Sequence, residues 1–566
     1  MAPAGRRRQA IFLKASPSPL PSSRLLPVAA FLVAVLVAMP VLSVAANLLA
    51  GGTGETWSHL ASTVLGEYVL NSLVLCLGVG MGTAMVGTGA AWLVAMHDFP
   101  GKRVFEWALL LPLAMPAYVL AYTYTDFLQF VGPVQTGLRE SFDWRRDDYW
   151  FPDVRSLPGA VVLFVCALYP YVYLLARTAF LERASGMIEV ARALGLGPWA
   201  AFRRVSLPLA RPAIAAGVAL ALMETLADYG TVAYFAVPTF TTGIYRAWFS
   251  LGDRAAAAQL AALLLGFVLL LLAAERLTRG RARYHDTTGR RRPFPGRQLR
   301  GWRALFAWLG CLVPLAVGFL IPGGLLLRLA VGEREGEFGQ RFWTLAGNSL
   351  TLAMVASCLA VALALVLGYA ARGGRGLLPR LANRVVGLGY AVPGSVIAVG
   401  VLIPVTRLDH FLAGIWQQLG GSHPGLLLTG GIAALVYAYL ARFLSIALQT
   451  VEAGLGKITP SMDDAARSLG FGSAGTLRKV HLPLLRGSLL TALLLVFVDV
   501  MKELPATLVM RPFNFDTLAT QTYTLAADER LAEASIVALA IVAVGLLPIG
   551  ILARQIAGGR TTDAAC

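Results

Sequence analysis

Four acidic residues lie within or beside apolar stretches of the chain, where a charged side chain is costly unless it faces protein or water. Glu224 and Asp228 are four residues apart, and Asp499 and Glu503 repeat that spacing at an offset of 275 residues. On a helix, residues four apart share one face, so each pair is expected to present two carboxylates together. Because hard cations prefer oxygen ligands, the spacing indicates a path for a hard cation.

Neighbouring residues widen the choice of roles for these carboxylates. Tyr229 could add a phenol oxygen to such a path, whereas Lys502 could neutralise a carboxylate beside it. In the alternative interpretation the acids are structural and lie at helix ends or in helix contacts. The candidate path residues are Glu224, Asp228, Tyr229, Asp499, Lys502 and Glu503.

The histidines and cysteines indicate no second chemistry. The six His are scattered over predicted loops without a metal-ligand spacing, and the five Cys form no close-spaced pair. Neither a zinc site nor a disulfide framework follows from such spacings. We therefore assign no metal site and no cofactor.

The composition is that of a membrane protein. Of the 566 residues 57% are hydrophobic and 14% are charged, and the mean hydropathy is +0.67, whereas a soluble protein carries roughly 25% charged residues. Apolar runs of the length that crosses a bilayer recur throughout, which predicts an all-α membrane protein with about twelve transmembrane helices. The expected ranges are 26–48, 69–96, 105–127, 158–178, 212–236, 256–274, 303–329, 344–371, 385–405, 425–448, 487–510 and 534–554.

The net charge of +17 is explained by topology rather than by nucleic-acid binding. Most Lys and Arg fall in alternate connecting segments, and the loop 48–68 contains none. This distribution follows the positive-inside rule and predicts cytoplasmic N- and C-termini. The apolar run after Arg6–Arg8 is too long for a signal peptide, so we expect a retained first helix.

One polar, basic segment occurs twice, between apolar runs. Residues 191–208 and 466–483 align without a gap, and both read Ala-Arg-x-Leu-Gly-x-Gly at the start and Val-x-Leu-Pro near the end. We call residues 189–208 the first loop and residues 464–483 the second loop. A membrane protein that repeats a cytosolic loop is expected to present the same surface twice, to a two-fold partner.

Each loop is predicted to form two short helices joined by a glycine turn. The first helix should stop at Gly195 or Gly470, because glycine allows the left-handed backbone that ends many helices. A second amphipathic stretch follows, and Pro208 or Pro483 suits the first turn of the next spanning helix. The resulting elbow would lie against the inner face of the membrane and fit a groove on another protein.

The two halves match beyond the loops. Asn71-Ser-Leu and Asn348-Ser-Leu open equivalent spans, and Met115-Pro-Ala corresponds to Val392-Pro-Gly. Six spans per half is an even number, so the halves are parallel repeats with a substrate path expected at their interface. The predicted parts are a cytoplasmic tail 1–25, a first repeat 26–274, a basic cytoplasmic linker 275–302, a second repeat 303–556 and a C-terminal tail 557–566.

Both loops resemble the Glu-Ala-Ala loop of binding-protein-dependent ABC importer permeases, which in that family docks on the ATPase subunit. The first copy has Val190 in place of the first Ala, and the second has Asp464 in place of Glu. The matching residues are Glu189, Ala191, Gly195, Leu207 and Pro208 in the first copy, and Asp464, Ala465, Ala466, Gly470, Leu482 and Pro483 in the second.

Two further stretches are similar to the fused two-half permeases of ferric iron importers. Residues 228–245 resemble the first half of that group, and residues 502–513 resemble its second half. The resemblance covers nearly the whole chain apart from the first twenty-odd residues and the linker. It implies the type I ABC importer permease fold and transport of ferric iron.

The resemblance also implies the partners. Two copies of an ABC ATPase subunit would grip the cytoplasmic loops, and a periplasmic or extracellular binding protein would deliver the substrate. The chain itself lacks a Gly-x-x-x-x-Gly-Lys-Ser/Thr phosphate cradle, so ATP hydrolysis is expected in a separate subunit. The expected location is the bacterial cytoplasmic (inner) membrane, with lipid as the remaining partner and no nucleic acid.

Three alternatives stay open at this point. A permease of the same class could carry thiamine, phosphonate or another small solute. A secondary carrier of the major facilitator type also has six plus six spans, but the segment 97–103 does not match the motif of that family and such a carrier has no use for the repeated loop. A membrane enzyme would need a cluster of catalytic side chains at the membrane surface, and the sequence offers none.

Overall fold

The computed structural model describes residues 25–49, 54–193, 195–279, 297–332, 338–373, 376–419, 422 and 425–561. Almost all of the predicted tail 1–25, most of the linker 275–302 and part of the tail 557–566 lie outside these ranges. The predicted domain boundaries therefore stay predictions.

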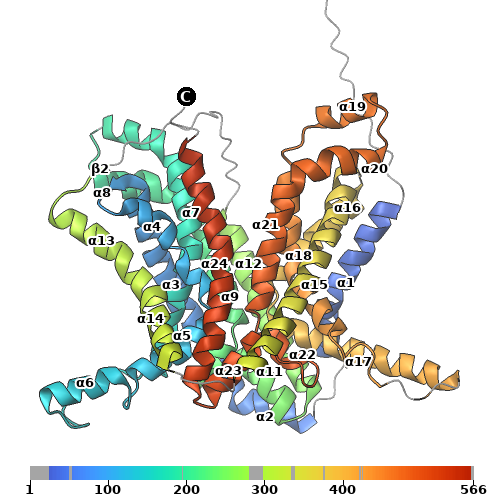
Figure 1. Cartoon of the computed structure of the whole chain (residues 1–566), viewed down its shortest axis with the longest axis horizontal. Helices are drawn as coiled ribbons and strands as arrows, with labels where there is room; N and C mark the ends of the chain where they lie inside the picture. The colour runs from blue at the N-terminus through green and yellow to red at the C-terminus, as the bar shows by residue number, and fades with distance from the viewer. Residues whose placement is uncertain are drawn as a thin grey trace, which may run out of the picture.

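The first half consists of helices, with short 3₁₀ or π turns labelled η (Figure 1). In chain order they are α1 (Leu25–Leu49), α2 (Gly54–Thr63), α3 (Leu65–Met96), α4 (Lys102–Ala108), η1 (Leu111–Ala114), α5 (Ala117–Leu128), α6 (Pro133–Phe142), α7 (Leu157–Ala193), α8 (Pro198–Ala201), η2 (Phe202–Ser206), α9 (Leu207–Ala227), α10 (Gly230–Tyr234), α11 (Phe240–Tyr245), η3 (Arg246–Ser250) and α12 (Arg254–Arg279).

The second half follows the same plan. Its elements are α13 (Trp302–Leu315), η4 (Ala316–Leu320), α14 (Ile321–Gly332), α15 (Phe338–Gly373), α16 (Leu377–Gly387), η5 (Gly389–Ala391), α17 (Gly394–Gln418), α18 (Ala433–Leu455), α19 (Pro460–Ser468), α20 (Ser473–Thr476), η6 (Leu477–His481), α21 (Leu482–Met501), α22 (Pro505–Met510), α23 (Leu518–Ala527) and α24 (Leu531–Thr561). A short parallel pairing of β1 (His97–Asp98) with β2 (Arg297–Gln298) joins the halves near the linker.

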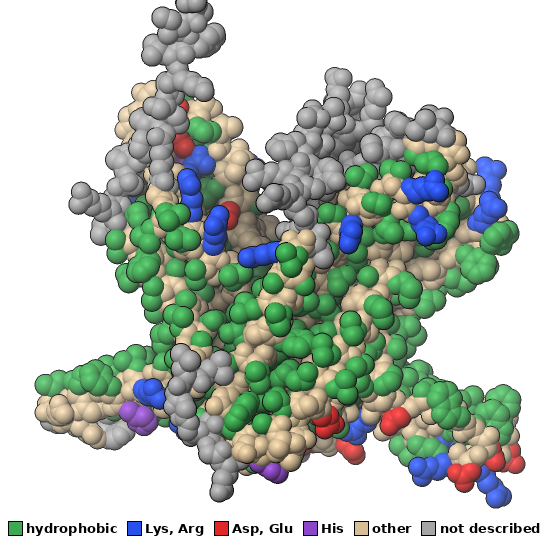
Figure 2. Space-filling model, turned by 180° about the vertical axis from the view of Figure 1, so that it is seen from behind, with side chains coloured by type: hydrophobic (Ala, Val, Ile, Leu, Met, Phe, Trp, Pro, Cys, Tyr) green, Lys and Arg blue, Asp and Glu red, His purple; other side chains and the backbone are tan. Residues whose placement is uncertain are grey.

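The all-α membrane fold predicted from the sequence is confirmed. Among the described residues 11 helices are long and apolar enough to cross a membrane. The number rises to 12 if the bent pair 102–114 and 117–142, which turns by 90°, counts as one span. Figure 2 shows hydrophobic side chains covering the middle of the visible face, with charged side chains gathered toward its two ends.

Two of the predicted spans are broken at matching prolines. The ranges 105–127 and 385–405 were expected to be continuous, but each contains a 3₁₀ turn that ends just before Pro116 or Pro393. Met115 and Val392 have extended backbones, with ψ of 113° and 123°. The residue before a proline is pushed out of the helical region by the ring, which explains why both helices stop there.

Each half is built on the same three-helix core. Helices α3, α7 and α9 pack pairwise in the first half, and α15, α18 and α21 do so in the second. The repeated asparagines fasten these cores at equivalent places. The Asn71 side-chain amide donates to the carbonyl of Pro238, and that of Asn348 donates to the carbonyl of Asp516, each at 2.9 Å. Both bonds tie a core helix to the chain that follows the short helix α10 or α22.

The outer helices are exchanged between the halves. Helix α1 packs on α15, α16 and α17 of the second half, whereas α24 packs on α4, α5 and η1 of the first. Helix α13 likewise contacts α3 and α4. In Figure 1 the loops at α8 and at α19–α20 lie at one end of the molecule, and α2, α6 and α23 lie at the other. The halves are therefore interlocked, with their equivalent loops on the same side.

The exchanged packing of α1 on α17 predicts how two glycines of α17 respond to alanine. A Cβ at Gly400 would lie 2.3 Å from the carbonyl oxygen of Pro40, whereas nothing lies within 4 Å of a Cβ at Gly414. We expect Gly400→Ala to lower the free energy of unfolding by about 1–3 kcal/mol, since the helices must separate. Gly414→Ala should be neutral or stabilising by up to about 1 kcal/mol.

Thermal unfolding of the two purified variants in detergent measures this difference. The wild-type chain in the same detergent is the reference. Equal melting temperatures for Gly400→Ala and Gly414→Ala would contradict the close contact between α1 and α17.

Candidate functional site

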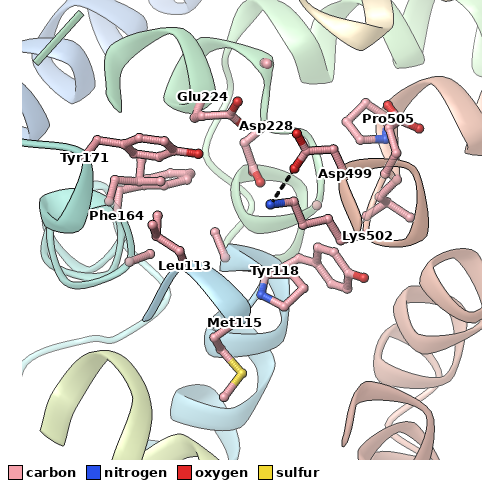
Figure 3. A pocket seen from close by; sticks show the side chains of 18 of the residues that line it. Leu113, Met115, Tyr118, Phe164, Tyr171, Glu224, Asp228, Asp499, Lys502 and Pro505 are labelled. Atoms are coloured by element: carbon pink, nitrogen blue, oxygen red, sulfur yellow. Dashed lines mark ion pairs between the residues drawn. The ribbon is translucent and has the colours of Figure 1, made fainter. Parts of the chain in front are cut away.

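Five of the six candidate path residues line one cavity between the two halves. Glu224 and Asp228 come from the end of α9, and Asp499, Lys502 and Glu503 come from the end of α21. The cavity has a volume of about 120 Å³. Figure 3 shows the labelled carboxylates and the lysine converging from the two helices. The repeated spacing in the sequence thus corresponds to two acidic pairs that meet in space.

The sixth candidate, Tyr229, lies outside the lining of this cavity. Its ring stacks on that of Tyr245, with centroids 3.6 Å apart and an interplanar angle of 13°. Both tyrosines line a second cavity of about 360 Å³, together with Tyr68 and Arg246. The phenol oxygen expected beside the acidic pairs is therefore supplied by other tyrosines.

The prediction that each acidic pair shares one helix face is wrong. Helix α9 ends at Ala227 and Asp228 has an extended backbone, with ψ of 138°. Its carboxylate accepts hydrogen bonds from the backbone N–H and the hydroxyl of Thr231, at 2.9 and 3.1 Å. The carboxylate satisfies the free N–H groups at the start of α10, which no helical carbonyl can reach.

Glu503 repeats this role in the second half. Helix α21 ends at Met501, and the Glu503 carboxylate accepts from the backbone N–H groups of Ala506 and Thr507 at 2.9 and 3.0 Å. The Thr507 hydroxyl donates to it at 2.6 Å. The second acid of each pair thus shapes the chain where the spanning helix breaks.

Two cations from the second half pair with acids of the same half. Lys502 Nζ lies 2.8 Å from Asp499 Oδ1, as the alternative interpretation of Lys502 anticipated. Arg442 Nη1 of α18 lies 3.3 Å from Glu503 Oε1 and its side chain is only 8% exposed. At an offset of 275 residues the first half has Ala167 and Ala227 in place of these cations. The acids are therefore repeated, but the cations are not.

Glu224 has a different environment. Its Oε1 accepts a hydrogen bond of 2.6 Å from the hydroxyl of Tyr390, which belongs to η5 in the second half. Among the described residues no Lys, Arg or His nitrogen forms an ion pair with it within 4.0 Å. Tyr118 and Tyr171 also line the cavity, and the buried Tyr118 hydroxyl has no hydrogen-bond partner in the described part of the chain.

Sequence reasoning missed four residues of this cavity: Arg442, Tyr390, Tyr118 and Tyr171. An arginine within the predicted span 425–448 was a usable signal, because an ionisable residue inside a membrane span is a functional candidate. The tyrosines gave no such signal, since aromatic residues are common in membrane helices. In the described ranges no group of three or more His, Cys, Asp or Glu side chains could hold a metal ion.

The first loop continues the helix that precedes it. Helix α7 extends to Ala193, so Glu189 and Ala191 lie on its last turns rather than on a separate short helix; of Glu189 only the backbone is described. Gly195 adopts a φ of +77°, as predicted for the turn. The second stretch runs directly into α9, where Leu207 and Pro208 form the first turn.

The second loop has a separate helix instead. Helix α18 ends at Leu455 and α19 begins at Pro460, because a proline favours the first turn of a new helix. Ala465 and Ala466 lie on α19, Gly470 has a φ of +79°, and Leu482 and Pro483 open α21. The glycine turn and the proline start are therefore common to both loops.

The second loop is fastened by an ionic cluster that the sequence did not indicate. We call Asp463, His481, Tyr369 and Arg372 the anchor cluster. Asp463 accepts from Arg372 Nη2 at 2.7 Å and lies 2.7 Å from His481 Nε2, and the Tyr369 hydroxyl bonds to the other ring nitrogen of His481. Arg372 also donates to the carbonyls of Leu455 and Ile458, each at 3.0 Å.

The acid of the loop motif, Asp464, is not part of this cluster. Its side chain is 59% exposed and pairs only with the nearby Arg467 among the contacts described. In the first half, the positions of His481 and Tyr369 are occupied by Ser206 and Trp92. Trp92 instead packs on Phe202 of the first loop, with ring centroids 4.6 Å apart. The two loops have the same turn but different anchors.

Comparison with known proteins places this geometry in a family. Residues 86–281 and 360–559 each match the family described as the binding-protein-dependent transport system inner membrane component. The matches cover both three-helix cores and both loops.

Relatives with a fused arrangement match along most of the chain. The Fe(3+)-transport system permease protein FbpB 2 of Haemophilus influenzae is 27% identical over 84% of this chain and 87% of its own length. The ferric transport system permease protein FbpB of Actinobacillus pleuropneumoniae is 23% identical over 86% and 69%. The molybdenum transport system permease protein ModB of Escherichia coli is 30% identical, but over only 33% of this chain and 82% of its own.

Membership of this family implies a substrate-binding protein and an ATPase partner, and it makes the chain a transport component rather than an enzyme. The many apolar helices agree with the inner-membrane location in the family description. The chain belongs to the inner-membrane components of binding-protein-dependent transport systems, as a fused two-half permease with two family units in one polypeptide.

Proposed function

We propose that this permease moves ferric iron across the bacterial inner membrane, driven by ATP that a separate subunit hydrolyses. The observation that carries the proposal is the extent of similarity. Relatives named for ferric transport match over both halves, whereas the molybdenum permease matches over a third of the chain.

The charge of the central cavity supports a cationic substrate. Four carboxylates, from Glu224, Asp228, Asp499 and Glu503, face two cations, Arg442 and Lys502, which leaves a formal charge of −2 when all are ionised. At low local dielectric such an excess attracts cations and repels oxyanions such as sulfate or molybdate. The candidate path therefore suits a metal cation better than the substrates of the shorter relatives.

The two loops support docking of two ATPase copies, one under each half. Both loops lie at the same end of the molecule (Figure 1) and both have the glycine turn. The positive-inside charge distribution makes this end cytoplasmic, together with both termini. The binding protein would then dock at the opposite end, near α2, α6 and α23, and deliver the ion to the interface of the halves.

The transport step would be a rocking motion of interlocked bodies. When the ATPase subunits close, they would move the loops, and each loop would move the core helix that continues from it, α9 or α21. Both helices end at the central cavity, so their displacement would change the distance between the two sets of carboxylates. The predicted repeats 26–274 and 303–556 are the units that we expect to be related by this motion.

The first test is uptake of radiolabelled ferric iron by cells with and without this gene, with thiamine and molybdate as comparison solutes. We expect iron uptake alone to fall on deletion, by roughly the tenfold or more that corresponds to loss of about 1.4 kcal/mol of coupling. The wild-type gene on a plasmid should restore it.

The solute that responds decides the substrate. Loss of thiamine or molybdate uptake with unchanged iron uptake would keep the permease and refute ferric iron. Loss of none of the three, in cells that lack other iron importers, would refute all three substrates.

The glycine turns predict a second result. Valine at Gly195 and Gly470 would hold a β-branched residue at positive φ, which costs roughly 1–2 kcal/mol per turn. We expect the double variant to lose most of its ATPase binding, measured by co-purification from membranes. Valine at Gly197 and Gly472 is the matched control, because these glycines have open space and ordinary φ. Equal losses in both double variants would contradict a role for the turns.

The anchor cluster predicts a contrast between two adjacent aspartates. Asp463→Asn removes the anion that binds Arg372 and His481, and breaking a buried pair costs roughly 3–5 kcal/mol. Asp464→Asn removes an exposed pair worth about 0–1 kcal/mol. We expect Asp463→Asn to lower iron uptake and melting temperature, and Asp464→Asn to leave the melting temperature unchanged. If Asp464→Asn has the larger effect on melting temperature, the cluster does not fasten the loop.

A further inference from the structure

The four carboxylates of the central cavity differ in what compensates them. Asp499 meets Lys502 at 2.8 Å, and Glu503 meets Arg442 as well as the N–H groups of α22. Asp228 accepts from the N–H and hydroxyl of Thr231. Each of these three carboxylates is engaged by a cation or by the start of a helix. A substrate ion would have to break those contacts to bind there.

Glu224 has no comparable compensation. Its described partner is the phenol of Tyr390, a neutral donor at 2.6 Å. A neutral hydrogen bond offsets only part of the cost of a carboxylate in a membrane interior. Glu224 is therefore the acid of the cavity that gains most from an incoming cation.

The surrounding donors are of the kind that a hard cation prefers. Tyr118 is 4% exposed, and its hydroxyl lacks a partner among the described residues although it lines the cavity. Tyr171 lines the same cavity from α7, and Tyr390 lies on the second half. Carboxylate and phenol oxygens are hard ligands, which suit small, highly charged cations rather than soft ones.

We propose that Glu224 is the transient ligand of the transported cation, and that its hydrogen bond with Tyr390 closes the empty path between the halves. The proposal rests on the function proposed above and names the residue at which the cation is held. When the halves move apart, the phenol leaves Glu224 with its proton, and the cation takes its place on the carboxylate. When they close again, Tyr390 returns and the cation is released.

The small number of strong ligands is consistent with passage rather than storage. No group of three or more His, Cys, Asp or Glu side chains in the described ranges could form a metal cage. Conduction requires binding that is strong enough for entry and weak enough for release. The equivalent position in the other half, Asp499, is already paired with Lys502, so the duplication yields one such ligand instead of two.

The test uses the complete complex in proteoliposomes, with the ATPase and the cognate binding protein loaded with radioactive ferric ion. In Glu224→Gln the amide oxygen can still accept from Tyr390, but the charge is gone. We expect iron uptake to fall roughly tenfold or more, the effect of losing one strong charged contact. ATP hydrolysis stimulated by the loaded binding protein should stay within about twofold of wild type, because the loops are untouched.

The control is Glu67→Gln, an exposed acid near the start of α3, which should change neither quantity. Wild-type vesicles that accumulate no iron would overturn the proposed function itself. Wild-type uptake that is matched by Glu224→Gln would leave that function in place and overturn the role of Glu224. A parallel loss of uptake and stimulated ATP hydrolysis would show a structural role and likewise overturn it.

A second variant addresses the hydrogen bond and covers a failure of Glu224→Gln to assemble. Tyr390→Phe leaves Glu224 charged but removes the donor that joins the halves. We expect a roughly two- to fivefold rise in ATP hydrolysis without binding protein, as the closed contact is lost, while iron uptake persists. An unchanged basal rate would overturn the closing role of Tyr390, and loss of iron uptake would overturn the assignment of Glu224 as a ligand that acts without it.

Discussion

The compensation of charge inside the membrane is the constraint on which the rest of this structure depends. A carboxylate in an apolar environment must find a cation, a set of hydrogen-bond donors or water. Asp228 and Glu503 find the free N–H groups at the starts of α10 and α22. This requires α9 and α21 to end within the membrane, and the ends of these helices form the central cavity.

Gene duplication explains the resemblance of the halves but not the chemistry between them. The acidic pairs, the three-helix cores and the glycine turns are repeated. The cations Arg442 and Lys502 belong to the second half alone, with alanines at the equivalent positions of the first. Because an exchange of outer helices interlocks the halves, both contribute side chains to one cavity. The result is a single asymmetric path inside a pseudo-symmetric frame.

The same division applies to the loops. Their turns are alike because a left-handed glycine is the simplest way to end a helix and redirect the chain. Their anchors differ, since the second loop is fastened by Asp463 and His481 and the first by the packing of Trp92 on Phe202. An ionic anchor is directional and fixes an orientation, whereas an aromatic contact tolerates sliding. The two halves need not transmit movement with equal stiffness.

The sequence by itself determined the features that depend on local chemistry. Apolar run length set the number of spans, the offset of 275 revealed the repeat, and Gly195 and Gly470 marked the turns. It also located the acidic pairs, but not the helix ends that separate Asp228 from Glu224, which follow from capping of the next helix. Only the tertiary structure brought Tyr390 to Glu224 and exchanged α1 with α24, because these contacts join residues far apart in the chain. Their free energies depend on packing and burial, which no local pattern encodes.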